Sequence, residues 1–396
     1  MTCWKSVRAV DFIDFNPHLN LKKGTIATKI GMDKLKPFSK KIPEAEKAEF
    51  NGGAKFCNGD TIMARITPCL ENGKTAFVDM LDEGEVGFGS TEFIVMRAKT
   101  GISDPQFVYY TTTNPAFRNV AIKSMVGSSG RQRVQQSVLE ELELPVPDLD
   151  EQKRIGTFLA RLDEKIVLNN RINDNLMQQA VTIFKSWFVE YSPFDGIEPQ
   201  EWETVNLEKI TSLISRGIAP KYSDNSDQIV INQKCIRNHM IDLSQARTHT
   251  PKVINEKWLR FGDLLINSTG DGTLGRAAQV WFQPQNITVD SHVTVVRPAK
   301  ENLIFYIGLW GVLHEREIES LHTGSTGQTE LPKERVKALE LHLPDNGTLD
   351  RFNSLIAPMV AAIVSKQNEN NKLATLRDAL LPKLMSGEID VSAIQL

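Results

Sequence analysis

The sequence has little cysteine and histidine, and neither residue is arranged to bind a metal. There are 4 cysteines (Cys3, Cys57, Cys69 and Cys235) without a C-x-x-C pair, and 7 scattered histidines without an H-E-x-x-H motif. A disulfide framework requires regular cysteine spacing in a small secreted chain, and a zinc site requires ligands at short fixed spacings. We therefore expect neither a disulfide scaffold nor a metal site.

Long apolar runs are also missing. No segment approaches the ~18–20 apolar residues that cross a bilayer, and Met1–Lys5 does not begin a signal peptide. We therefore expect a cytoplasmic protein that has no membrane partner.

The chain has no excess of positive charge. It contains 46 Lys+Arg and 49 Asp+Glu, which give a formal net charge of −3. This balance argues against a generic polyanion binder but allows local basic faces. The 41% hydrophobic and 24% charged residues are typical of globular proteins, and 396 residues suffice for two or three domains.

Catalytic and nucleotide-binding motifs are incomplete. Gly270–Gly275 spells G-x-G-x-x-G, but strand-like residues follow it, so we predict a turn between two strands instead of a dinucleotide site. Asn114–Phe117 is similar to the Asn-Pro-Pro-aromatic motif of amino-methyltransferases, but its third residue is Ala, and we predict a helix start there. No G-x-x-x-x-G-K-[ST] motif and no repeated Ser/His/Asp set occurs. We therefore expect no catalytic residues in this chain.

The sequence does contain an internal repeat with a period of about half the chain. Several pairs of segments match in the same order along both halves, which indicates a duplicated unit. The pairs are Trp4–Val7 with Trp202–Val205, Gly59–Ile62 with Gly262–Leu265, Gly73-Lys74 with Gly275-Arg276, Ser90–Arg97 with Asp290–Arg297, Gly127–Gly130 with Gly324–Gly327, and Leu142–Pro147 with Leu339–Pro344.

Each copy has two zones. The first contains short apolar runs separated by Gly, Pro, Asn and Asp, which predict a mixed domain with many strands. The second has apolar residues at three- and four-residue steps, which predict a long helix. We predict an α+β protein with two mixed α/β domains separated by two long helices. The predicted segments are a first domain over 1–148, a central helix over 149–192, a second domain over 193–346 and a distal helix over 347–396.

The two predicted helices share a heptad pattern with a polar middle. That middle lies around Asn169 and Asn173 in one helix and around Gln367 and Asn370 in the other. Neither helix can bury its seam alone, so we predict an antiparallel coiled coil whose polar positions set the register. The alternative is that each helix packs on its own domain. The predicted seam residues are Leu159, Leu162, Ile166, Asn169, Asn173, Leu176, Ile183, Leu355, Met359, Leu373, Leu376 and Leu380.

The loops of both copies carry side chains that suit double-stranded DNA. Asn and Gln can pair with adenine, Arg and Lys with guanine, and small Gly-Ser loops offer N–H groups and hydroxyls to phosphate. Because the loop types repeat, we favour a shared binding role over simply solvated loops. The candidate DNA-binding residues are Lys34, Lys36, Lys40, Arg65, Lys74, Ser90, Thr91, Arg131, Arg133, Lys221, Asn232, Gln233, Lys234, Arg237, Thr269, Thr273, Arg276, Ser291, His292, Ser325 and Gln328.

Several segments of the chain follow a pattern known from one protein family. The most specific are Leu144–Pro147, Glu151–Ile155, Leu162–Ile166 and Leu380–Ile389, and weaker ones are Asn232–Ile236, Thr273–Ala277 and Gly324–Gln328. On these segments the chain resembles, over its whole length, the specificity subunits of Type I restriction–modification systems. The second copy departs from the family pattern at Leu349–Phe352, where the usual Glu-Gln pair is missing.

This resemblance implies a non-catalytic subunit whose two target-recognition domains each read one half of a split DNA site. The helices would set the unread spacer and dock two modification (methyltransferase) subunits, and restriction subunits with translocase activity would join them. S-adenosylmethionine, ATP and magnesium would be bound by those partners and none of them by this chain. Two alternatives are a coiled-coil scaffold that bridges proteins without DNA specificity and a methyltransferase with its own cofactor.

Overall fold

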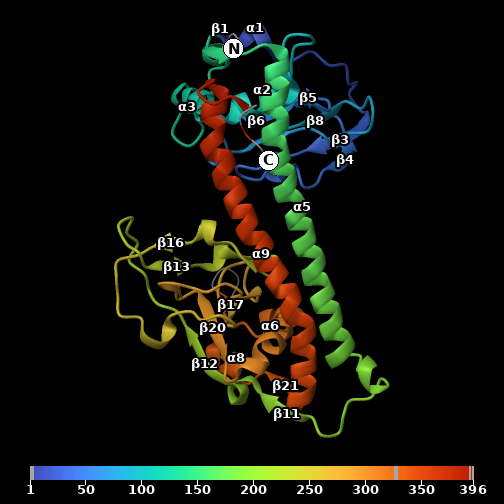
Figure 1. The fold of residues 1–396 in the computed structure, drawn as a ribbon, viewed down its shortest axis with the longest axis vertical. Helices are drawn as coiled ribbons and strands as arrows, with labels where there is room; N and C mark the ends of the chain where they lie inside the picture. Colours follow the sequence, from blue (N-terminus) through green and yellow to red (C-terminus); the bar gives the residue numbers. More distant parts are fainter. Residues whose placement is uncertain (1–3, 325–328, 392–393, 395–396) are drawn as a thin grey trace. The chain divides into compact units, whose positions relative to one another are not determined.

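Two long helices contribute to both structural units of the chain in the computed structural model, which describes residues 4–324, 329–391 and 394. Unit 1 comprises residues 1–169 and 368–396, and unit 2 comprises residues 170–367. The helices are α5 (Leu149–Phe188) and α9 (Asn346–Met385), each of 40 residues (Figure 1). The division into four segments that we made from the sequence stays a prediction.

Unit 1 is built on an antiparallel sheet in the order β2-β9-β6-β7. A second sheet has the order β4-β3-β8-β5, with β3 and β8 parallel. The strands of the two sheets are β2 (Ile13–Phe15), β3 (Ile26–Ile30), β4 (Glu46–Glu49), β5 (Ala54–Phe56), β6 (Thr61–Ala64), β7 (Thr75–Phe77), β8 (Gly87–Gly89) and β9 (Phe93–Ala98). The remaining elements before α5 are the pair β1 (Lys5–Arg8) and β10 (Glu143–Val146), and the helices α1 (Ala9–Phe12), α2 (Pro105–Thr113), α3 (Pro115–Lys123) and α4 (Gln136–Glu140).

Strand β9 shows how the sequence forms these layers. Successive side chains of a strand point to opposite faces of its sheet. Ile94 and Met96 pack in one core with Phe107 of α2, whereas Phe93 and Val95 pack in another core that includes β3 and β5 of the second sheet. An apolar run that is buried on both faces therefore forms the central strand.

Unit 2 repeats this topology. Its main sheet has the order β12-β20-β17-β18, which corresponds strand by strand to β2-β9-β6-β7. Its smaller sheet is β16-β13-β19, with β13 and β19 parallel. The strands are β11 (Glu203–Asn206), β12 (Thr211–Arg216), β13 (Ile229–Ile231), β14 (Ile236–Arg237), β15 (Met240–Ile241), β16 (Arg247–Thr248), β17 (Leu264–Asn267), β18 (Ala277–Gln279), β19 (Ile287–Val289), β20 (Val293–Pro298) and β21 (Glu340–Leu343), and the helices are α6 (Ile304–Leu313), α7 (Glu315–Ser320) and α8 (Lys333–Lys337).

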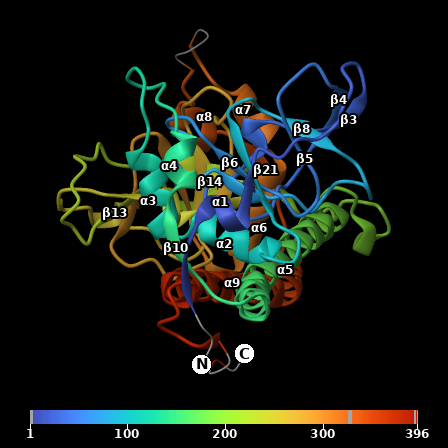
Figure 2. The ribbon, with the colours of Figure 1, turned by 90° about the horizontal axis from the view of Figure 1, so that it is seen from above.

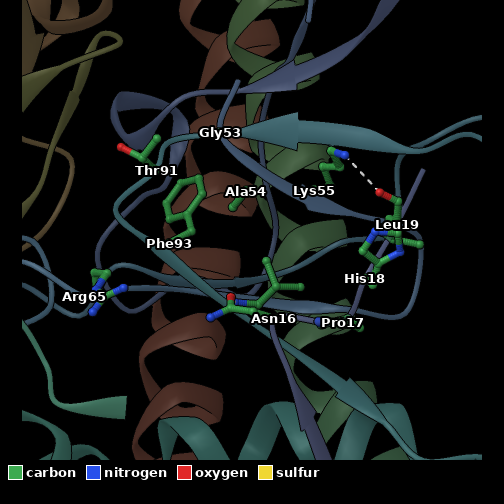
Figure 3. A pocket seen from close by; sticks show the side chains of 11 residues that line it. Asn16, Pro17, His18, Leu19, Gly53, Ala54, Lys55, Arg65, Thr91 and Phe93 are labelled. Carbon is green, nitrogen blue, oxygen red and sulfur yellow. Dashed lines mark hydrogen bonds between the residues drawn. The ribbon is translucent and has the colours of Figure 1, made fainter. Parts of the chain in front are cut away.

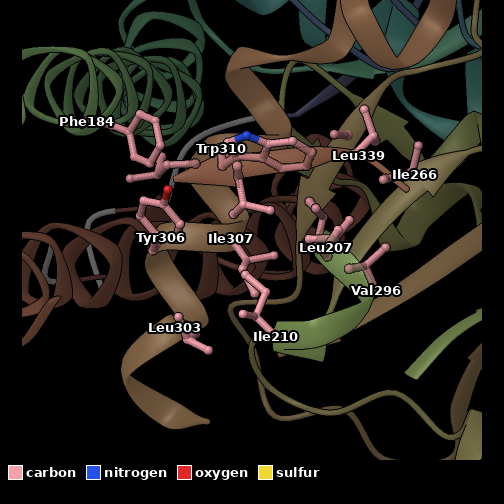
Figure 4. Close-up of a cluster of buried hydrophobic side chains, with 14 of the residues drawn as sticks. Phe184, Leu207, Ile210, Ile266, Val296, Leu303, Tyr306, Ile307, Trp310 and Leu339 are labelled. Atoms are coloured by element: carbon pink, nitrogen blue, oxygen red, sulfur yellow. The ribbon is translucent and has the colours of Figure 1, made fainter. Parts of the chain in front are cut away.

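The core of unit 2 joins this sheet to the long helices. Figure 4 shows Ile266 and Val296 of the sheet, Tyr306 and Trp310 of α6, and Phe184 of α5 in one buried cluster. Each of these five side chains is at most 4% exposed. Unit 2 therefore has its own hydrophobic core, as unit 1 does.

Helices α5 and α9 pair antiparallel. Within unit 1, Asp163 contacts Arg377 at 2.6 Å and Asn169 donates to Asn370 at 2.9 Å, so residue numbers rise along α5 while they fall along α9. The two helices lie side by side in both views (Figure 1 and Figure 2). The predicted fold class, two mixed α/β units with two long antiparallel helices, is confirmed.

The buried seam of α9 is one residue later than we predicted. Leu355 and Leu376 are both 44% exposed, whereas Ile356 is fully buried and Arg377 is the residue that contacts α5. In α5, Met177 and Phe184 are buried where we predicted Leu176 and Ile183, which are only partly buried. The physical reason is that adjacent apolar residues satisfy a heptad count equally well, and an α-helix of 3.6 residues per turn drifts against a 3.5-residue repeat. No described helix is both long and apolar enough to span a bilayer.

Candidate nucleic-acid interface

Three segments of unit 1 meet at one end of the main sheet. The Arg65 N–H donates to the Glu92 carbonyl at 2.9 Å, and the Val134 N–H donates to the Arg65 carbonyl at 2.9 Å. The Thr67 N–H donates to the Gln132 carbonyl at 3.0 Å. Residues 65–67, 90–92 and 131–134 therefore lie together, and they bring Arg65, Ser90, Thr91, Arg131 and Arg133 of the predicted site into one region.

Three segments of unit 2 meet through the same backbone contacts. The Ser268 N–H donates to the His292 carbonyl at 2.8 Å, and the Leu331 N–H donates to the Ser268 carbonyl at 2.8 Å. An isolated bridge joins Thr269 and Glu330. The predicted residues Thr269, Ser291 and His292 are thus brought together. Ser325 and Gln328 lie outside the described residues.

The matched backbone frames carry different side chains. The shared hydrogen bonds place Arg65 where Ser268 stands, and Glu92 where His292 stands. The bridges Val126–Arg133 and Thr323–Glu330 likewise place Arg133 where Glu330 stands. Two copies of one scaffold therefore present different hydrogen-bonding groups at equivalent positions.

The side chains at these positions form separate networks. In unit 1 the Arg133 guanidinium donates to both oxygens of Glu92, with Nη2 2.6 Å from Oε1, and this hydrogen bond lowers the pKa of Glu92. In unit 2 Glu330 pairs instead with Arg216 of β12. Arg133 therefore pairs with Glu92 in the loop before β9, whereas the equivalent Glu330 pairs with Arg216 of β12.

An open pocket of about 410 Å³ adjoins the meeting point in unit 1 (Figure 3). Figure 3 shows Arg65 and Thr91 on one side of this pocket and His18 and Lys55 on the other. Lys55 Nζ donates to the Leu19 carbonyl at 2.9 Å. Arg65 lines this pocket, and its buried Nε has no hydrogen-bond partner among the described residues.

Sequence reasoning missed His18 and Lys55. His18 follows β2 and Lys55 is the middle residue of β5, at positions where the repeat has no matched segment. The Asn16-Pro17 turn before His18 was the available signal, because proline directs the chain away from a strand.

The site in unit 2 is a hydrogen-bonded group of polar side chains. Thr269 Oγ1 donates to Gln233 Oε1 at 3.2 Å and lies 2.8 Å from His292 Nδ1. Gln233 belongs to the short turn that Asn232 caps by accepting the Lys234 N–H at 2.8 Å. Thr273 and Arg276 bond to backbone carbonyls of residues 269–272, the loop that joins β17 and β18.

Some predicted lysines have other roles. Lys40 is turned inward: its Nζ donates to Gln106 and lies 5.0 Å from the Tyr110 ring centroid, and burial lowers its pKa. A phosphate contact by Lys40 was therefore a wrong prediction, because the position of a lysine in a basic run does not show which way it points. Lys34 pairs with Glu44 at 2.7 Å, and Lys74 donates to a backbone carbonyl. The remaining predicted cations are exposed: Lys36, Arg131, Lys221, Lys234 and Arg237.

Two sequence motifs have the structural roles that we predicted. Residues 270–275 form a turn between β17 and β18, and Asn114 caps α3 by accepting the Ala116 N–H at 3.0 Å. Among the described residues, no group of His, Cys, Asp and Glu side chains is arranged to hold a metal ion.

Known proteins share both sequence and fold with this chain. A family model described as the Type I restriction modification DNA specificity domain matches residues 48–178 and 199–373. The specificity subunit of the MjaIX enzyme from Methanocaldococcus jannaschii is 26% identical over 313 residues, which cover 73% of this chain and 70% of that protein. The HindI specificity subunit from Haemophilus influenzae is 22% identical over 407 residues, covering 84% of this chain and 86% of that protein.

One solved structure supports the fold. The S subunit of a Type-I restriction-modification system from M. genitalium matches 97% of this chain and 96% of its own length. The TM-score is 0.53 at 14% sequence identity.

Proposed function

Since this chain belongs to the family of Type I restriction–modification DNA specificity subunits, we propose that it recognises a split, asymmetric DNA sequence and reads one half with each unit. The helices α5 and α9 hold the two reading units a set distance apart, and the base pairs between the half-sites are not read. Half-sites about one helical turn apart, ~34 Å, are presented on the same side of a duplex.

The observation that carries this proposal is the pair of matched frames with different side chains. Arg65, Glu92 and Arg133 in unit 1 have the counterparts Ser268, His292 and Glu330 in unit 2. Arginine donates to guanine, and serine and histidine can donate to or accept from other base edges. Because equivalent backbone positions carry different side chains in the two units, the units are suited to recognise two different half-sites.

In this proposal the chain selects the site and catalyses nothing. It works in the cytoplasm, where two modification subunits dock on its helices and bind S-adenosylmethionine, and restriction subunits with ATP and magnesium join that complex. The absence of a matched catalytic set in the two sequence halves supports this division of labour.

Methylome sequencing tests the proposal directly. Cells that express this chain with its modification subunit should show methylation at a split motif with two different halves. Absence of any split motif, or methylation at one contiguous palindrome, would contradict the proposal.

A single substitution can then assign one half-site. Arg65→Gln should weaken or relax recognition of one half only, by about 1–3 kcal/mol for a lost bidentate base contact. Lys29→Gln is the matched control, because Lys29 is paired with Glu46 at 2.7 Å and should leave both halves unchanged.

A further inference from the structure

One edge of unit 2 carries a row of exposed cations around Tyr222. Segment 221–223 pairs with segment 248–250: the Ser223 N–H donates to the Thr248 carbonyl at 3.2 Å, and the Thr250 N–H donates to the Lys221 carbonyl at 2.7 Å. We name the exposed residues on and beside these segments the Tyr222 strip, which consists of Lys221, Tyr222, Arg247 and Lys252.

Two contacts order the strip before any ligand binds. The Arg247 guanidinium carbon lies 3.6 Å from the centroid of the Tyr222 ring. An arginine stacked on an aromatic ring keeps the N–H groups at its edge available, and it loses less rotamer freedom when it binds. Lys252 Nζ donates to the Ala219 carbonyl at 2.6 Å, which leaves its other N–H groups for a second acceptor.

The strip cations are not neutralised by acids. Within the described part of unit 2, the ion pairs of Arg and Lys with acids lie elsewhere, as at Arg297–Asp263. Asp224, Asp242 and Glu256 are the acids nearest in sequence to Lys221, Arg247 and Lys252. Among the described residues, none of these acids forms an ion pair with the strip. Asp227 accepts a hydrogen bond from Asn286 at 2.9 Å. The strip therefore presents positive charge to solvent.

In the equivalent sheet of unit 1, β4-β3-β8, two lysines on the strands are paired with acids. Lys29 pairs with Glu46 at 2.7 Å, and Lys47 pairs with Glu85 at 2.8 Å. Burial alone would raise the pKa of Glu85, but hydrogen bonds from Lys47, Thr28 and a backbone N–H lower it to about 2. This carboxylate is therefore ionised at neutral pH, and its lysine partner is occupied.

We infer that the Tyr222 strip binds the phosphodiester backbone of duplex DNA and supplies sequence-independent affinity that the paired Lys29 and Lys47 of the equivalent sheet of unit 1 do not supply. This inference rests on the proposed function, since it assigns the phosphate grip of the DNA-binding chain to one unit. Phosphate contacts position a protein on DNA, and each one releases condensed counterions. Arg247 and Lys252 become DNA contacts that the sequence did not indicate.

The salt dependence of DNA binding tests the strip. The full-length chain with its modification subunit would be titrated with a duplex that lacks the recognition site, over a series of salt concentrations. In the triple variant K221Q/R247Q/K252Q, the slope of log K against log[salt] should fall by about 0.9 for each lost phosphate contact. R247K keeps the positive charge but removes the guanidinium group that stacks on Tyr222. It should therefore weaken DNA binding and leave the slope of log K against log[salt] nearly unchanged.

The matched control is K29Q/K47Q in unit 1, whose lysines are already paired. Its salt slope should equal that of the wild-type complex. An unchanged salt slope in the triple variant would overturn the inference about the strip. If the same variant still directed methylation to a split site, the proposed function would stand. A wild-type complex that does not bind DNA would overturn both. Equal thermal unfolding of the variants and the wild-type complex would show that the fold is retained.

Discussion

An ion pair with a buried aspartate occurs at the same place in both units. Arg97 lies 2.7 Å from Asp60 in unit 1, and Arg297 lies 2.7 Å from Asp263 in unit 2. Asp60 and Asp263 are 1% and 0% exposed. Each pair links the central strand, β9 or β20, to the turn before β6 or β17. The pair therefore holds the strands whose far ends carry the candidate DNA-binding residues.

Breaking one of these pairs should destabilise its unit strongly. Arg297 is only 6% exposed, and Asp263→Asn leaves its guanidinium buried without a counter-charge. We expect a loss of about 3–5 kcal/mol in the free energy of unfolding, measured by urea denaturation. The double variant Asp263→Leu with Arg297→Met should recover part of that loss, because it leaves no uncompensated charge.

An exposed pair is the control for this prediction. Arg8 and Asp11 are 47% and 48% exposed, so Asp11→Asn should cost less than about 1 kcal/mol. If Asp263→Asn lowered the free energy of unfolding only slightly, or if the single and double variants lost the same amount, the stability of unit 2 would not depend on pairing these two buried charges.

The candidate site was only partly predictable at the level of single residues. Thr91 was predicted because it lies in a repeated segment, and Arg65 because it is a basic residue in a loop between strands. His18 and Lys55 were missed because only the tertiary structure brings them to the pocket, His18 from the loop after β2 and Lys55 from β5, which pairs with β8. Lys40 was misplaced because its direction depends on contacts with α2, which lies far away in the sequence.

At the scale of elements, the long helices followed most directly from the sequence. Asp148 and Asp345 cap α5 and α9 by accepting the N–H groups of Glu151 and Thr348, at 2.9 and 3.0 Å. The polar middle also behaves as predicted at Asn169, which is fully buried and bonds to Asn370. Local capping and periodicity thus define the helices, whereas the phase of their seam does not follow from them.

The phase of the seam can be tested at one pair of neighbours. Ile356 is fully buried in the core of unit 2, and Leu355 is 44% exposed. Ile356→Ala should lower the free energy of unfolding by about 2–5 kcal/mol, because it leaves a cavity. Leu355→Ala should change it by about 0.5 kcal/mol or less. Comparable losses from both substitutions, measured by urea denaturation, would contradict the observed seam.

For the whole molecule, the net charge of −3 is consistent with DNA recognition because the positive charge is distributed unevenly over the chain. Many lysines of unit 1 are held by acids, while the Tyr222 strip of unit 2 is not. A reader with too much general attraction to phosphate would remain bound at wrong sequences. The balanced total therefore favours discrimination, and the local strip supplies attraction.

The spacing role of the helices gives a prediction for the complete chain. Inserting one heptad into α5 near Asn169 and one into α9 near Asn370 would lengthen each helix by about 10 Å, the rise of about three base pairs. Both half-sites should be retained, and the unread gap between them should lengthen. Methylome sequencing would measure the gap, and an unchanged gap would refute the spacing role. A matched variant with Leu355→Ala alone should keep the original gap.

The sequence by itself determined the duplication, the two long helices, their polar middle and the family, because each depends on local periodicity or on the order of matched segments. Only the tertiary structure decided which loop side chains meet, which lysines are paired or buried, and which helix residues form the seam. These features depend on strand register and on contacts between residues far apart in the chain, such as Arg133 with Glu92 and Lys40 with Gln106. A one-residue shift in register or helix phase changes them while leaving the local pattern intact.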